Sequence, residues 1–86
     1  MIALNRAVAH AMAFGPAAGL ALADTLADEP ALKNYHLLPG VRGDLLFKLG
    51  RFDEARTAFE RAAALTRNAR EREVLLGRAA ESAARP

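Results

Sequence analysis

Two histidines and a pair of glycines are the residues of this chain whose types could do chemistry. His10 and His36 could act as acids, bases or metal ligands, but they lie on different predicted helices with no nucleophile nearby in sequence. Neither has metal-ligand spacing to the other or to a carboxylate, and the chain has no cysteine. Gly15 and Gly19 fit a turn and a close helix contact better than a phosphate-binding loop. We therefore expect no catalytic residue, no metal and no cofactor, and a packing or helix-start role for His36.

The arginines offer a second kind of chemistry, the binding of nucleic-acid phosphates. Residues 1–30 hold one basic and three acidic side chains, whereas residues 31–86 hold eleven basic and seven acidic ones. The arginines of this basic half alternate with carboxylates, as in "EARTAFER" and "REREVLLGR", and the chain has only five aromatic residues on which bases could stack. Interspersed signs are typical of a solvated helix face. Nucleic-acid contact through the predicted fourth and fifth helices is therefore the alternative that we favour less.

The composition predicts that helices position these residues. The chain has 21 alanines and few β-branched residues, a bias that favours helix strongly and predicts an all-α fold. Gly15-Pro16, Pro30 and Gly50-Arg51 mark turns, and Asn68 followed by Glu71 resembles a capping box. The predicted helices cover residues 2–14, about 16–28, roughly 35–49, the segment from the Gly50-Arg51 turn to about 66, and 69–83.

The start of the third helix has two alternatives. Asn34 is a good N-cap, but Pro39 would then fall inside the helix and kink it; alternatively, the regular helix begins at Pro39. The stripes expected to be buried are Leu4, Val8, Ala11 and Met12; Ala18, Leu22, Thr25 and Leu26; Leu38, Val41, Leu45, Leu46 and Leu49; Ala55, Ala58, Phe59, Ala62 and Leu65; and Leu75, Leu76, Ala79 and Ala80.

The uncharged run between Arg6 and Asp24 is a false lead to a membrane or targeting segment. It is alanine-rich, is interrupted by Gly15-Pro16, and is too short for a membrane span. We expect two packed soluble helices there, and no membrane partner.

The second and fourth predicted helices share a spacing: a glycine at the turn, then an alanine, then a large apolar residue four positions later. The matched residues are Gly15 and Gly50, Ala18 and Ala55, and Leu22 and Phe59. Their separations of 35 to 37 residues are close to the period of the tetratricopeptide repeat, about 34 residues, whose signature includes a small residue and then A-x3-F. With Gly43, Ala55, Phe59 and Ala62, the second hairpin resembles this family well, and the first resembles it in degenerate form.

This resemblance implies a tetratricopeptide-like fold of helical hairpins. A single domain over residues 1–86 would hold a hairpin at 2–29, a hairpin at 35–66 and a capping helix at 69–83. Small side chains would let the two helices of a hairpin cross closely, and the large one would fill the gap toward the next hairpin. A generic alanine-rich helical bundle that serves as a dimerisation module is the alternative.

A narrower resemblance covers residues 3 to about 80. The blocks "ALNRAVA", "GPAAGLALAD", "YHLLPGVRGDLLFKLGR" and "EARTAFERAAALTRNARERE", in this order, resemble the C-terminal extension of extracytoplasmic-function-type RNA polymerase sigma factors. The promoter-binding sigma domains are absent from these residues, so we expect either an excised domain or a short reading frame that kept only the extension. The resemblance implies a non-catalytic, cytoplasmic protein-interaction domain with a role in bacterial transcription initiation.

The repeat family also implies a binding groove lined by the first helix of each hairpin. The groove positions that match are Leu37, Gly40, Asp44, Phe47 and Lys48 on the third helix and Ala7, His10 and Ala11 on the first. Phe47 would be either an exposed anchor or a residue packed against the fifth helix. The expected partners are the sigma domains, RNA polymerase or a second copy of the chain, which would make a homo-oligomer.

Overall fold

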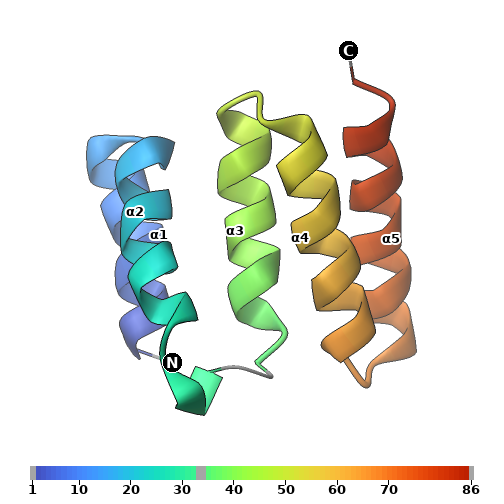
Figure 1. Cartoon of the computed structure of the whole chain (residues 1–86), viewed down its shortest axis with the longest axis horizontal. Coiled ribbons are helices and arrows are strands. Elements are labelled where there is room, and N and C mark those ends of the chain that lie inside the picture. Colours follow the sequence, from blue (N-terminus) through green and yellow to red (C-terminus); the bar gives the residue numbers. More distant parts are fainter. Residues whose placement is uncertain (1, 33–34, 86) are drawn as a thin grey trace.

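The chain folds into five α-helices and one 3-10 turn in the part that the structure describes (Figure 1). This computed structural model describes residues 2–32 and 35–85, with side chains from residue 5 onward. The elements are α1 (Ile2–Phe14), α2 (Pro16–Ala27), η1 (Pro30–Leu32), α3 (Leu37–Lys48), α4 (Phe52–Leu65) and α5 (Ala69–Ala83). No strand occurs within these ranges, and the predicted all-α fold of helical hairpins is confirmed. No helix among the described residues has the length and apolar character that a membrane crossing requires.

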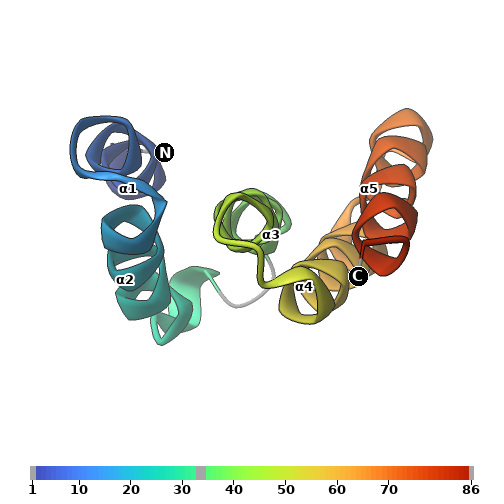
Figure 2. The same cartoon turned by 90° about the horizontal axis from the view of Figure 1, so that it is seen from above.

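Successive helices pack on one another and form a bent row. Looking along the helices, Figure 2 shows α1, α3 and α5 toward one side and α2 and α4 toward the other. Contacts between neighbours in sequence dominate, whereas α1 and α3 touch only slightly. We call the side formed by α1, α3 and α5 the concave face, because α1 and α5 rise on either side of α3 (Figure 2).

Both hairpin turns depend on a glycine with a left-handed backbone. Gly15 has φ +99° and Gly50 has φ +78°, a region that side-chain-bearing residues rarely adopt. Pro16 follows Gly15 as the first residue of α2, where its missing N–H costs nothing. The predicted turns at Gly15-Pro16 and Gly50-Arg51 are confirmed.

The start of α3 differs from both sequence alternatives. The helix begins at Leu37 with His36 as N-cap, so Pro39 is its third residue. The first N–H groups of a helix have no partner inside it, and Pro39 therefore breaks no hydrogen bond and causes no kink. The amide of Gly40 donates to the carbonyl of His36 over 3.3 Å, which continues the helix past the proline. Asn34, the N-cap that the sequence predicts under the first alternative, lies outside the described residues.

The crossing of α3 and α4 is close because α3 presents a glycine to a phenylalanine. A Cβ atom on Gly43 would lie 2.7 Å from Cε1 of Phe59, nearer than real Cβ atoms come to other atoms. The Phe59 side chain is 1% exposed, so its ring has no room to move away. Leu45, Leu46, Ala55 and Ala58 surround it in the main core cluster.

The helices α1 and α2 also cross closely through small residues. The residues at this contact lie one position along α2 from those that the sequence predicts. A Cβ atom on Gly19 would overlap that of Ala11, and Ala7 and Ala23 are fully buried. Ala18 and Leu22, the predicted contact residues, are only half-buried. The contact residues of the two hairpins are 36 positions apart: Ala7 corresponds to Gly43, Gly19 to Ala55, and Ala23 to Phe59. The prediction missed this register because alanines occupy neighbouring positions all along α2.

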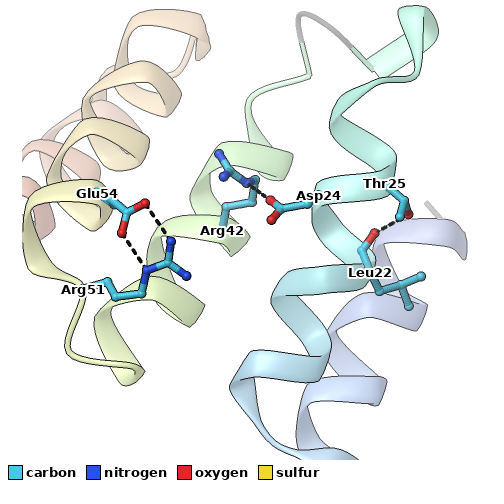
Figure 3. Close-up of polar contacts among 6 residues, drawn as sticks. All are labelled: Leu22, Asp24, Thr25, Arg42, Arg51 and Glu54. Atoms are coloured by element: carbon cyan, nitrogen blue, oxygen red, sulfur yellow. Dashed lines mark hydrogen bonds and ion pairs between the residues drawn. The ribbon is translucent and has the colours of Figure 1, made fainter.

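Several predicted core positions are wrong. In α1, Val8 is 40% and Met12 84% exposed, since Ala7 and Ala11 face α2 instead. Thr25 is exposed, and its hydroxyl donates to the Leu22 carbonyl over 2.6 Å (Figure 3). The exposed members of the predicted α5 stripe are Leu76 and Ala80, whereas Ser82, which was not predicted, is buried.

Polar contacts join the hairpins and fix the helix starts. Arg42 of α3 donates from Nε to Oδ1 of Asp24 on α2 over 2.7 Å (Figure 3). Asn68 caps α5 by accepting a hydrogen bond from the amide of Glu71 over 2.9 Å, as the sequence predicts. At the start of α4, Arg51 donates from Nε and Nη2 to the two carboxylate oxygens of Glu54, over 2.6 and 2.7 Å.

Replacing Gly43 by alanine should destabilise the protein, although alanine favours helix. The added methyl group would meet the buried ring of Phe59, and overpacking of this kind costs about 1–3 kcal/mol. Gly77→Ala is the matched control: nothing lies within 4 Å of its Cβ position, and we expect a gain of about 0.5–1 kcal/mol. Urea unfolding followed by circular dichroism measures both. Equal gains for the two variants would contradict the close crossing.

The Arg51–Glu54 pair should appear as a shifted titration. Hydrogen bonds from Arg51 hold the pKa of Glu54 below its ordinary value. Because the pKa of Glu54 is lower in the folded than in the unfolded chain, the pair stabilises the fold at pH values above the ordinary pKa of a glutamate. This stabilisation is lost as the pH falls through the lowered pKa. Arg51→Gln should bring the pKa of Glu54 back up, as measured by carboxyl-carbon NMR, whereas Arg56→Gln should leave it unchanged. An unchanged pKa in Arg51→Gln would show that the pair does not form in solution.

Candidate protein-binding face

The concave face keeps large apolar side chains in contact with solvent. Val8 and Met12 of α1, Leu37 of α3 and Val74 of α5 are between 40% and 84% exposed. Buried apolar positions of the chain are largely alanine and leucine within the two core clusters, so these four side chains lie outside the packed interior. Exposed apolar residues gathered on one side of a protein mark a surface that other molecules can cover.

A hollow of about 230 Å³ lies between α1 and α3. Val8, Ala11 and Met12 of α1 form one wall, with Pro16 at its end. The α3 wall consists of Val41, Asp44, Leu45 and Lys48. The hollow exists because the first hairpin leans on α3 mainly through α2, which leaves α1 apart from α3.

A second hollow of about 300 Å³ lies between α3 and α5. Leu37 and Val74 line it, and Phe59 contributes to its floor. Nε2 of His36 contacts Oε1 of Glu71 at this hollow, and this contact joins the starts of α3 and α5. Val41 and Asp44 line both hollows, so α3 forms the ridge between them.

Arg78 of α5 ties this helix to the rest of the fold. Its guanidinium bonds to Oδ1 of Asp44 over 2.8 Å and lies 4.9 Å from the ring centre of Phe59 and 5.4 Å from that of Phe47. A cation held over an aromatic face is attracted by the electrons of the ring. One side chain thus anchors α5 to both helices of the second hairpin.

Phe47 lines neither hollow. Its ring packs edge-on against Phe52 with centroids 5.1 Å apart, and the guanidinium groups of Arg78 and Arg85 lie over it. The side chain is half-buried. Of the two alternatives that the sequence left open, packing against α5 describes Phe47 better than an exposed anchor.

The other predicted groove residues divide in the same way. Leu37, Asp44 and Lys48 line the hollows, whereas the ring of His10 packs at a tilt against that of Phe14, with ring centres 4.8 Å apart, and lines neither. Val8, Met12 and Val74 were not predicted to lie on this face. For α1, Gly19 could have indicated this exposure. Gly19 packs against Ala7 and Ala11, so these two residues face α2, and Val8 and Met12 lie at the side of the helix.

Among the described residues, no group of three or more potential metal ligands lies together.

Several arginines of the basic half take part in contacts within the chain. Arg72 donates to the carbonyls of Ala63 and Thr66 over 3.2 and 2.8 Å and so satisfies the end of α4. Arg42, Arg51 and Arg78 pair with carboxylates, as described above. These arginines serve the fold, which reduces the positive charge available to a phosphate backbone.

Arg78→Met should loosen α5 without unfolding the hairpins. The variant keeps the length of the side chain but removes the Asp44 pair and the contacts with the rings, which we expect to cost about 1 kcal/mol at this partly exposed site. Hydrogen exchange should accelerate in α5 more than in α1 and α2. Arg70→Met, an exposed position on the same helix, is the control. Unchanged exchange in α5 for Arg78→Met would contradict this anchoring role.

Comparisons with known proteins agree with this architecture. Residues 41–69, from α3 through α4, match the family model of the tetratricopeptide repeat. An uncharacterized protein of Rhizobium meliloti (strain 1021) is 49% identical over 71 residues, which are 83% of this chain and 16% of that protein. The chain thus spans about a sixth of the length of this relative. No solved structure matches. The chain contains a tetratricopeptide-like region, and repeats of this family generally mediate protein–protein interaction.

Proposed function

We propose that this chain is a non-catalytic protein-binding module whose partner docks on the concave face. The observation that carries the proposal is the set of exposed apolar side chains, Val8, Met12, Leu37 and Val74, beside the two hollows. The tetratricopeptide match supports it, since repeats of this family present such a face to peptides and proteins.

The chemistry of the face suits a polypeptide partner. Covering apolar surface stabilises a complex by roughly 25 cal/mol per Å², and a side chain such as valine gains most when a partner fills the space beside it. Met12, which is 84% exposed, is unbranched and can adapt its shape to the partner. The hollows have few charged groups that are not already paired within the chain.

We further propose that the module belongs to the C-terminal extension of an extracytoplasmic-function-type sigma factor. The ordered sequence blocks from residue 3 to about 80 support this assignment. The chain also matches only a small part of a much longer relative, which leaves room for other domains in that protein. In this role the partner would be the sigma domains or RNA polymerase, and the site of action would be the bacterial cytoplasm.

Binding to purified sigma domains and to core RNA polymerase of the host bacterium tests the proposal. The double variant Val8→Ser/Met12→Ser should weaken binding about tenfold or more, because two apolar side chains lose their contacts with the partner. Leu76→Ser is the matched control, since Leu76 is 48% exposed and lines neither hollow.

Surface plasmon resonance gives the affinities, and light scattering tests whether a second copy binds instead. Equal loss in the control and the double variant would contradict docking on the concave face. Binding of neither sigma domains nor polymerase would contradict the assignment to transcription. A dimer that the double variant disrupts would identify the second copy as the partner.

A further inference from the structure

We propose that the partner segment seated between α1 and α3 is amphipathic and acidic. It places an apolar side chain in the hollow and a carboxylate on the ammonium group of Lys48. This inference rests on the proposed function, because it names the chemistry of the partner that the concave face would bind.

The hollow is apolar except at two positions of α3. Val8, Met12, Val41 and Leu45 give it walls that suit an aliphatic or aromatic side chain. Its volume of about 230 Å³ is enough for one large side chain. The exceptions are Asp44 and Lys48, which lie one helical turn apart and so follow the same side of α3.

Of these two residues, Asp44 is paired with a side chain of opposite charge within the chain, and Lys48 is not paired with any described residue. Asp44 is held by Arg78 from the α5 side, over 2.8 Å, so its charge is balanced within the chain. Lys48 makes no ion pair with any residue that the structure describes, and its side chain is exposed. The wall of the hollow therefore carries one uncompensated positive charge.

Nothing on the neighbouring helix offsets this charge. The opposite wall belongs to α1, whose sequence from Ile2 to Phe14 contains no carboxylate. The other carboxylate in the hollow, that of Asp44, is already paired with Arg78, so a carboxylate from a partner could bind Lys48.

The second hollow lacks this feature. Its histidine and carboxylate, His36 and Glu71, are paired with each other, and Arg78 is paired with Asp44. The charge preference should therefore come from the α1–α3 hollow alone. Leu45 and Lys48 are three positions apart, so a helical partner lying along α3 would present its apolar residue and its carboxylate about one turn apart.

Selection from a displayed library of random peptides, each of about twelve residues, tests this inference. Peptides that bind the wild-type chain should be enriched in an apolar residue with Asp or Glu one turn away. Selection on Lys48→Glu should lose this acidic preference and favour Lys or Arg instead, and Lys48→Gln should favour neither. The control, Arg56→Glu, changes the net charge equally at an exposed position of α4 and should keep the wild-type preference.

The best peptide is then titrated into the isotope-labelled chain and followed by NMR. We expect shifts at Val8, Met12, Val41 and Lys48, and affinity about three- to tenfold weaker for Lys48→Glu than for Arg56→Glu. Peptides that shift these residues without an acidic preference would overturn the inference and leave the proposed function standing. Failure to select any peptide, or shifts only outside the concave face, would overturn both.

Discussion

The contact between Gly43 and the ring of Phe59 decides how this chain is built. Phe59 is the largest fully buried side chain among the described residues, and it fits only because α3 has no Cβ at the crossing. Close approach through a small residue also occurs in the first hairpin, where Gly19 meets Ala11. Each hairpin is therefore held by a backbone-to-side-chain contact that larger residues would separate. These contacts are apolar. The polar side chains of the chain therefore lie at helix ends and on the surface, where they form hydrogen bonds and ion pairs.

The position of α3 follows from that contact and determines the concave face. With one side against α4 and another against α2, α3 presents Val41 and Asp44 as a ridge between two hollows. The core is small, and alanines supply much of it. A helix whose inward positions are alanines leaves its larger side chains at the flanks, as Val8 and Met12 of α1 show. The exposed apolar surface is thus a consequence of close packing between the helices.

The sequence predicted the helices well and the exposed face poorly, for physical reasons. Glycine and proline at the turns, and Asn68 at the start of α5, act locally, so their effects can be read without the fold. The burial of α3 and α4 was predictable because leucines and Phe59 contrast with charged neighbours. In α1 and α2 alanine is nearly everywhere and gives no contrast, so Val8 and Met12 were assigned to the core. Phe47 could not be placed either, because its surroundings come from Phe52, from Arg78 of α5 and from Arg85 beyond the end of α5, which is 38 positions away.

The most direct test of this account is the nuclear Overhauser effect between the α-protons of Gly43 and the ring protons of Phe59. The account predicts strong cross-peaks, because ring carbons lie near the place where a Gly43 side chain would begin. It also predicts that the ring shifts the Gly43 α-protons away from ordinary helical values. Absent cross-peaks with ordinary shifts would mean that α3 and α4 do not cross at this glycine. The ridge, the two hollows and the binding face built on them would then have no basis.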